Sequence, residues 1–194
     1  MMNFLALVTL IAWPVVPLFW IPVHLFPHFF RKIKLLTYIM PLFIWLPVAC
    51  LTYQHRDFLL HYKINFHVII LASGVLLLTA GTALHIWTLK LLGLRGIIGM
   101  PEVYEKIPGR FVSTGAFSVV RHPTYLAHTM MLTGVFLATG VISAGIVAGV
   151  DFSVVNLIII PLEEKELLNR FGEEYRDYRN KVPKFFPRRI SEIK

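Results

Sequence analysis

Apolar residues dominate four long stretches of the chain, at residues 4–30, 35–53, 64–92 and 125–162. A membrane-crossing helix needs about 20 mostly apolar residues. The first three stretches therefore predict one span each, and the fourth is long enough for two short spans. Gly140 and residues 143–145 supply the small residues of a tight turn between those two. The pattern predicts an all-α integral membrane protein with about five transmembrane helices.

Prolines interrupt the first of these stretches. Each proline removes a backbone donor and disturbs the preceding turn of a helix, so we expect a kinked helix or a helix followed by an interfacial segment. No cleavable signal peptide is expected, because the N-terminus lacks a basic region and a small-residue cleavage site. The four prolines are Pro14, Pro17, Pro22 and Pro27.

Basic residues are divided unevenly between the two sides of the predicted membrane. The segment 31–34, the loop 90–121 and the tail 165–194 hold 17 of the 19 Lys and Arg residues, whereas the other side holds only Arg56 and Lys63. Because Lys and Arg are enriched on the cytoplasmic side, we expect a cytoplasmic C-terminus and an external N-terminus. The membrane would be the plasma membrane in a prokaryote and the endoplasmic reticulum in a eukaryote.

The composition agrees with a lipid bilayer as the surroundings. Charged residues make up 15% and hydrophobic residues 56% of the chain, against about 25% charged residues in a soluble domain. The net charge of +8 is explained by topology, so no nucleic-acid partner is expected. The only cysteine, Cys50, excludes an intrachain disulfide and a thiolate zinc site.

The polar chemistry is concentrated in the second half of the chain. Residues 1–92 are interpreted as membrane anchor, and residues 93–194 as the catalytic region. The loop 93–121 is too polar for lipid and too long for a simple connector, and its segment 111–120 is expected to be extended. After Pro161, apolar residues recur at spacings of three and four up to Pro183, which predicts an amphipathic helix that begins at Pro161.

Two carboxylates stand unusually close to the last apolar stretch. Glu163 and Glu164 directly follow the sequence "NLIIIPL", and acidic side chains near hydrocarbon usually face a cavity, a partner or a ligand. Asp151, inside the stretch, marks a polar pocket or a turn. No HExxH pair, GxSxG or P-loop is present, so no metal is expected. These features predict a pocket at the cytoplasmic face, where a polar cofactor meets a lipid-like substrate.

Two motifs together resemble one enzyme family. "RHPTY" at residues 121–125 and "EEKELLNRFGEEYRDYRNKVPKFFP" at residues 163–187 are similar to the signature of the isoprenylcysteine carboxyl methyltransferase and phospholipid methyltransferase superfamily. The resemblance covers about the last ninety residues and implies S-adenosylmethionine as the cofactor. It implies an acceptor-side role for Glu163, with Glu164 beside it. The cofactor-binding residues that it implies are Glu102, Tyr104, Gly109, Arg110, Phe111, Val112, Phe117, His122, Pro123, Thr124 and Tyr125.

Two departures from the family pattern concern the acceptor. Related enzymes often carry a histidine at the position of Gly109 and an arginine at the position of Ile159. Such an arginine could bind the carboxylate of an acceptor. The acceptor favoured by the resemblance is the carboxylate of a C-terminal prenylated cysteine, which is already ionised and needs no general base. The alternative is the amine of phosphatidylethanolamine, for which Glu163 or Glu164 would accept a proton.

Two other classes of protein compete with a methyltransferase. A membrane sterol-type reductase shares an RHPxY-like motif and would bind NADPH, but the chain has few spans to enclose a ring system. A small channel or scaffold would bind neither cofactor and leaves Arg121, His122 and Glu163 without a role.

Overall fold

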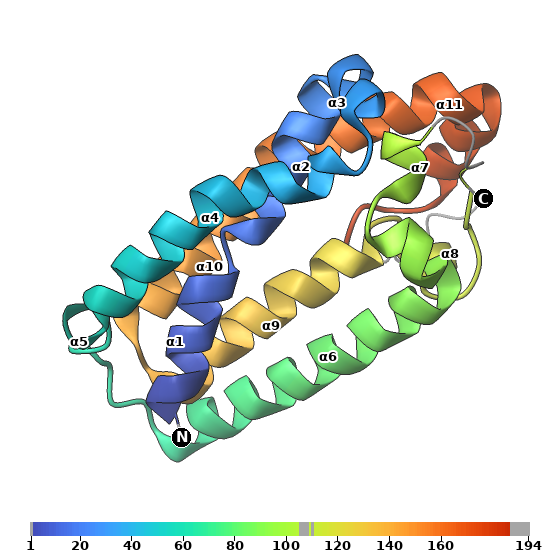
Figure 1. Ribbon diagram of the computed structural model, residues 1–194. Coiled ribbons are helices and arrows are strands. Elements are labelled where there is room, and N and C mark those ends of the chain that lie inside the picture. The colour runs from blue at the N-terminus through green and yellow to red at the C-terminus, as the bar shows by residue number, and fades with distance from the viewer. Residues whose placement is uncertain (1, 105–108, 110, 187–194) are drawn as a thin grey trace.

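The computed structural model describes residues 2–104, 109 and 111–186, and these form helices joined by short connections (Figure 1). The prediction of an all-α fold is confirmed. The helices are α1 (Met2–Ala12), α2 (Val15–Leu25), α3 (Pro27–Ile33), α4 (Leu36–Gln54), α5 (Arg56–Leu59), α6 (Val68–Ile97), α7 (Met100–Val103), α8 (Ala116–Val119), α9 (Pro123–Thr139), α10 (Ile142–Val154), the π-helix η1 (Val155–Ile159) and α11 (Ile160–Lys181).

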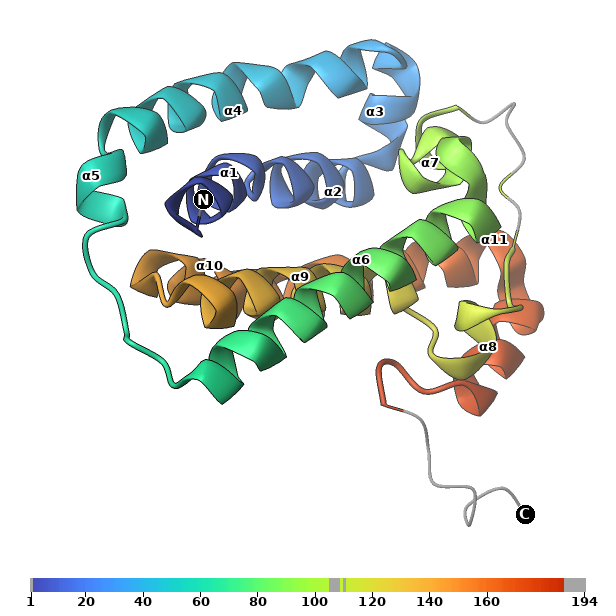
Figure 2. The same ribbon diagram turned by 90° about the horizontal axis from the view of Figure 1, so that it is seen from below.

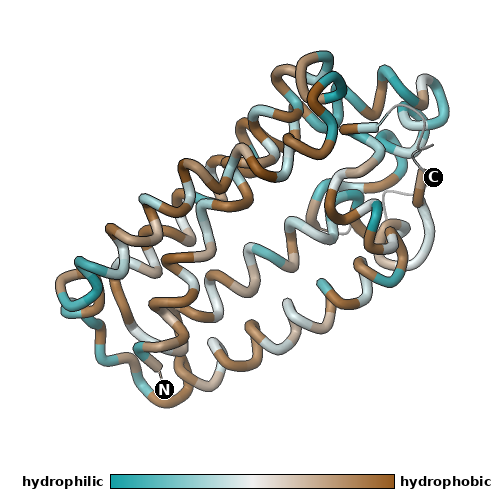
Figure 3. The backbone as a smooth tube through the Cα atoms, viewed as in Figure 1, coloured by the Kyte–Doolittle hydropathy of each residue, from teal (hydrophilic) through white to brown (hydrophobic). Residues whose placement is uncertain are grey.

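Four helical segments of the described chain are long and apolar enough to cross a membrane: Met2–Leu25, Leu36–Gln54, Val68–Val103 and Ile142–Lys181. The remaining predicted span corresponds to α9, whose 17 residues reach the lower end of the spanning range. Hydrophobic residues line these helices, whereas hydrophilic residues gather at α11 and at the α5 end (Figure 3). The chain is a multi-pass membrane protein.

The first span is kinked, as its prolines predict. Helix α1 ends at Ala12, α2 begins at Val15, and α3 starts directly on Pro27. Viewed from below, α1 and α2 lie between α4 on one side and α9 and α10 on the other (Figure 2). The first span therefore separates α4 from the helices that carry the two motifs.

Helices α6 and α9 lie side by side in opposite directions (Figure 1). Their backbones approach closely at glycines: a Cβ atom on Gly74 would lie 2.5 Å from Ala138 N, and one on Gly134 would lie 2.6 Å from Leu78 N. Small residues at such contacts are the usual means by which membrane helices pack. The predicted cofactor region lies at one end of this helix pair, where α6 ends and α9 begins.

The turn between α9 and α10 differs from its prediction. Gly140 caps α9 with a left-handed backbone, φ 68°, and any side chain there would collide with Ile64 O. Residues 143–145, also assigned to the turn, lie inside α10. The turn is shorter than predicted because Gly140 alone supplies the conformation that it requires.

The amphipathic helix α11 begins at Ile160 with Pro161 in its first turn, as predicted, but no break separates it from the helix before it. Helices α10, η1 and α11 follow one another without a break until a kink inside α11 at Gly172, where φ is 54° and ψ is −126°. Proline lacks an N–H and its ring crowds the carbonyl four residues earlier. The wider turn of a π-helix directly before Pro161 relieves that crowding, so the helix passes through. The predicted end before Pro183 is confirmed.

The loop 93–121 is more helical than predicted. Helix α6 continues past a kink at Gly93, φ 70° and ψ 166°, and α7 and α8 follow. The expectation of an extended segment is wrong for residues 116–119, which form α8. Gly115, with φ 62°, lets the chain turn into that short helix. The alternation of small and apolar residues had suggested an extended backbone there.

Asp151 is a buried carboxylate in α10 and not a turn residue. Its Oδ1 accepts a hydrogen bond from Trp13 Nε1 at 2.8 Å and lies 3.3 Å from His128 Nε2. The side chain is 1% exposed, so it contributes a polar contact between the first span, α9 and α10.

Which end of the bundle faces the cytoplasm stays a prediction. Helix α5 lies at the end where α1 begins, and α3, α7 and α11 lie at the other end (Figure 1). We expect a phosphatase fused within residues 60–67 to be active outside the cell, and one fused after residue 186 to be inactive because it is cytoplasmic. Phosphatase activity in the second fusion would contradict the assigned orientation.

Candidate active site

A cavity of about 310 Å³ opens between α2, the end of α6, α7, the start of α9 and α11. Its lining combines charged, polar and aromatic side chains from both halves of the chain. The lining residues are Trp20, Leu92, Arg95, Gly96, Pro101, Glu102, Gly109, Phe111, Val112, Phe117, Arg121, His122, Thr124, Tyr125, Glu163, Leu167, Arg170, Phe171, Tyr175 and Tyr178.

Most of the residues that the resemblance assigned to cofactor or acceptor come together here. Those that line the cavity are Glu102, Gly109, Phe111, Val112, Phe117, His122, Thr124, Tyr125 and Glu163. Tyr104, Pro123 and Glu164 do not line it, and Arg110 lies outside the described residues. The division into an anchor and a catalytic region stays a prediction, and the cavity takes Trp20 and Leu92 from the anchor part.

Sequence reasoning missed the wall that α11 provides. Phe171, Tyr175 and Tyr178 were interpreted only as the apolar face of an amphipathic helix, and they line the cavity. Phe111 packs against all three, with ring centroids 5.3, 6.0 and 5.1 Å away. Arg170, on the same helix, also lines the cavity. The periodic aromatic residues were the available signal.

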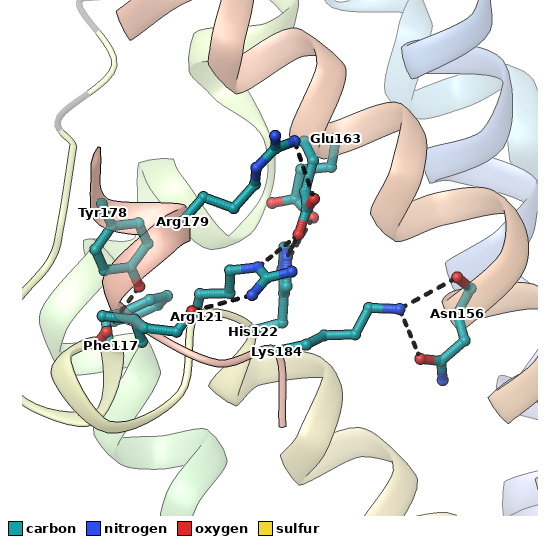
Figure 4. Close-up of polar contacts among 10 residues, drawn as sticks. Phe117, Arg121, His122, Asn156, Glu163, Tyr178, Arg179 and Lys184 are labelled. Atoms are coloured by element: carbon teal, nitrogen blue, oxygen red, sulfur yellow. Dashed lines mark hydrogen bonds and ion pairs between the residues drawn. The ribbon is translucent and has the colours of Figure 1, made fainter. Parts of the chain in front are cut away.

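Glu164 is the centre of a buried ion cluster beside the cavity. Its Oε1 accepts hydrogen bonds from Arg121 Nε at 2.7 Å and lies 2.9 Å from His122 Nε2. Arg179 Nη1 lies 3.9 Å from its Oε2. Figure 4 shows the arginine and histidine side chains converging on the glutamates of α11. Arg121 is therefore held in place by contacts within the protein.

The segment that follows α11 closes back over the RHPxY motif. The backbone N–H of Arg121 donates to Pro183 O at 2.9 Å, and that of His122 donates to Lys184 O at 3.4 Å. Lys184 Nζ contacts Asn156 Oδ1 in η1 at 3.1 Å (Figure 4). We call residues 182–185 the closing segment. It joins the start of α9 to the π-helix and fixes their relative positions.

His122, Pro123 and Tyr125 form the first turn of α9. Pro123 occupies the first turn, where its missing N–H costs no helical hydrogen bond. The rings of His122 and Tyr125 lie 5.9 Å apart, so they share one face, as predicted. Both side chains line the cavity and are largely buried, with 4% and 8% exposure.

Glu163 lines the cavity, and one of its two carboxylate oxygens has no hydrogen-bond partner among the described residues. Its Oε2 is buried and has no hydrogen bond among the described residues, and its closest charged neighbour is His122 Nδ1 at 3.8 Å. The two adjacent glutamates therefore differ: Glu164 is bound to protein cations, and Glu163 presents a free carboxylate oxygen to the cavity.

A second ion network forms the opposite wall. Arg170 Nη1 lies 2.9 Å from Glu102 Oε1 and 3.5 Å from Glu166 Oε1. Glu166 also contacts His24 Nδ1 of α2 at 2.7 Å. A side chain at Gly109 would meet the Arg170 guanidinium, the mobile end of a long side chain, so Arg170 would have to move to accept one.

Four buried polar atoms of the cavity lining lack a partner among the described residues: Glu102 Oε2, Thr124 Oγ1, Glu163 Oε2 and Tyr175 Oη. An unpaired buried polar atom costs about 1–3 kcal/mol, so their convergence indicates a polar ligand. Two of them are carboxylate oxygens and require donors or a cation. S-adenosylmethionine offers an ammonium group, ribose hydroxyls, an adenine amine and a sulfonium, so these residues fit that cofactor.

The described part of the chain contains no cluster of metal-ligating side chains. No group of three or more His, Cys, Asp or Glu side chains there is arranged to hold an ion. That no metal takes part stays a prediction.

Comparison with known proteins yields one family and several partial relatives. The family model described as phospholipid methyltransferase matches residues 69–174. Methanethiol S-methyltransferase 1 of Bradyrhizobium diazoefficiens is 32% identical over 103 residues, which cover 53% of this chain and 35% of the relative. Methanethiol S-methyltransferase of Crocosphaera subtropica is 34% identical over 98 residues, 50% of this chain and 37% of the relative.

A third relative carries a different name. The nickel-cobalt-cadmium resistance protein NccN of Alcaligenes xylosoxydans xylosoxydans is 32% identical over 77 residues, 40% of this chain and 36% of the relative. The chain thus spans about a third of the length of the curated relatives that it matches. No solved structure matches it significantly.

Proposed function

We propose, since the chain belongs to the phospholipid methyltransferase family, that it transfers the methyl group of S-adenosylmethionine to an acceptor that enters from the membrane. The family expected from the two motifs is confirmed. The observation that carries the proposed activity is that one cavity, at the start of the RHPxY helix, is lined by four residues that each keep a buried polar atom without a partner among the described residues.

The residues of the cavity divide into a donor side and an acceptor side. Glu102 and Thr124 would hold polar groups of the cofactor, and the aromatic residues around Phe111 would pack against its base. The cofactor supplies, when bound, a methyl group on a positively charged sulfur. The protein then aligns the acceptor for in-line displacement and excludes water, which accounts for much of the rate in such reactions.

An acceptor that loses a proton is supported by the position of Glu163 in the cavity lining. The carbon–sulfur bond of the donor breaks as the acceptor forms its bond to the methyl carbon. With a thiol or an amine, the acceptor's proton passes to the Glu163 carboxylate, whose Oε2 has no other partner among the described residues. The relatives named methanethiol S-methyltransferase support a thiol.

The prenylcysteine carboxylate favoured by the sequence is the second candidate. It needs no proton acceptor, and it would meet Glu102 and Glu163, two like charges, in the cavity. Ile159, where a clamp arginine would stand, is fully buried and lies outside the cavity lining. Arg95 and Arg170 both line the cavity, so either could bind an acceptor carboxylate in place of the missing arginine.

Binding of S-adenosylhomocysteine tests the proposed cofactor. We expect the purified protein in detergent to bind it by calorimetry and not to bind NADPH. His122→Ala and Glu102→Gln should each weaken the affinity at least tenfold, because each removes a polar contact of the cavity, equivalent to about 1.4 kcal/mol.

The matched control is Glu174→Gln, an exposed position on α11, which should bind as the wild type does. A folded wild-type protein that binds NADPH instead would favour the reductase. Methyl transfer to an alkanethiol, to phosphatidylethanolamine and to a prenylcysteine analogue then distinguishes the acceptors.

A further inference from the structure

His122 lies between the two adjacent glutamates of α11 and faces each of them with a different ring nitrogen. Its Nε2 is 2.9 Å from Glu164 Oε1, and its Nδ1 is 3.8 Å from Glu163 Oε2. The ring points toward the glutamates (Figure 4), and its side chain is 3% exposed. His122 and Glu163 line the cavity, whereas Glu164 does not. The three side chains therefore lead from the cavity lining to a carboxylate behind it.

Glu164 determines which nitrogen of the neutral ring carries the proton. Its Oε1 also accepts a hydrogen bond from Arg121 Nε at 2.7 Å, so Glu164 is an ionised carboxylate and can only accept. The hydrogen bond made by one imidazole nitrogen sets the state of the other. His122 therefore donates through Nε2, which leaves a lone pair on Nδ1, the nitrogen that faces Glu163. Other enzymes activate a nucleophile with a histidine that a carboxylate holds in this way.

The charges around His122 favour the uptake of one proton. Arg121 and Glu164 neutralise each other, and Arg179 lies 3.9 Å from the second oxygen of Glu164. The ionic contact recorded for Glu163 among the described residues is the one to His122. A proton on His122 would therefore give Glu163 an opposite charge and would strengthen the hydrogen bond to Glu164. The two carboxylates together would stabilise an imidazolium at this place.

We infer that His122 takes up the proton that the acceptor loses during methyl transfer, with Glu163 passing the proton on and Glu164 holding the ring. This inference rests on the proposed function and deepens it. As a thiol acceptor forms its bond to the methyl carbon and the carbon–sulfur bond of the donor breaks, the thiol proton moves to Glu163 Oε2 and then to His122 Nδ1. The products are a neutral thioether, S-adenosylhomocysteine and an imidazolium, which returns its proton to water after they leave.

An acceptor that is already ionised tests this role. Imidazole ordinarily holds a proton about two pKa units more tightly than a carboxylate does, so loss of the ring should slow a thiol acceptor by roughly tenfold to a hundredfold. His122→Gln keeps an N–H donor for Glu164 but cannot accept a proton. We expect this variant to bind S-adenosylhomocysteine and to lose at least tenfold in single-turnover rate with an alkanethiol. An alkaneselenol, which is ionised at neutral pH, should react at close to the wild-type rate.

The matched control is His128→Gln on the same helix. His128 Nε2 also lies close to a carboxylate, 3.3 Å from Asp151 Oδ1, but His128 does not line the cavity. This variant should methylate the thiol and the selenol in the same ratio of rates as the wild type. Equal rate losses with both acceptors in His122→Gln, or an unchanged rate with the thiol, would overturn the inference.

The protonation of the ring gives a readout that does not depend on turnover. Nitrogen-15 NMR of the histidine-labelled protein, with the His122 signals identified by their absence in His122→Gln, should show the neutral ring protonated at Nε2. A neutral ring protonated at Nδ1 would overturn the inference. A wild-type protein that does not bind S-adenosylhomocysteine, or that methylates neither acceptor, would instead overturn the proposed function.

Discussion

Replacement of Glu164 by alanine is expected to destabilise the protein by about 1.5–3 kcal/mol, the contribution of a hydrogen bond between charged groups, because the pair is only partly buried. The carboxylate lies 2.7 Å from Arg121 and 2.9 Å from His122, and the side chains of all three are at most 16% exposed. Its loss leaves a buried guanidinium without its carboxylate and releases the start of α9. Unfolding by SDS in mixed micelles measures the change.

The matched control for this experiment is Glu173→Ala on the same helix. Glu173 pairs with Arg176, but the two side chains are 75% and 57% exposed, and such surface pairs contribute about 0–1 kcal/mol. We also expect Glu164→Ala to lose S-adenosylhomocysteine binding, because His122 no longer holds its position. Equal stability losses in the two variants would show that the cluster at Glu164 does not fix the site.

Glu163→Gln is expected to slow methyl transfer at least tenfold while the protein stays folded and binds S-adenosylhomocysteine normally. Tenfold corresponds to about 1.4 kcal/mol in the barrier. The amide cannot take a proton from the acceptor, and it is close in size to the carboxylate that it replaces. Single-turnover rates with a thiol acceptor, beside Glu174→Gln as the control, measure the effect.

The structure does not support a role for Glu163 that is limited to stabilising the N-terminus of a helix. A carboxylate at a free helix N-terminus contributes about 0.3–1 kcal/mol through the helix dipole, but α10, η1 and α11 form one continuous helix through this position. Near-normal turnover in Glu163→Gln would therefore exclude the proton-accepting role, and it would favour the carboxylate acceptor, which needs no base.

The elements of the fold follow largely from local patterns. Long apolar stretches identified the spans, prolines identified the kink in the first span, and three-and-four spacing identified α11. The start of α11 near Pro161 was also predicted, but hydropathy and a proline do not reveal the π-helix that joins α11 to the preceding helix. Its wider turn depends on backbone geometry, and no residue type in the segment "VNLII" requires it.

The site was harder to predict because its contacts join distant residues. Glu163 and Glu164 stood together in the sequence and were given related roles, yet one faces the cavity and the other binds Arg121, 43 residues away. Arg170 meets Glu102 across 68 residues. Nothing local in "FWIPVH" indicates that Trp20 reaches the cavity, since an aromatic residue in a span is normally read as lipid-facing or core.

The closing segment also sets an order in which the protein must be completed on the ribosome. The spans that precede it can enter the bilayer one after another, guided by hydropathy alone. The backbone N–H groups of Arg121 and His122, however, wait for acceptors at positions 183 and 184, about sixty residues later in synthesis. The membrane insertion of the spans before residue 121 and the assembly of the candidate active site are therefore separate events, and the second depends on a segment translated about sixty residues after the RHPxY motif.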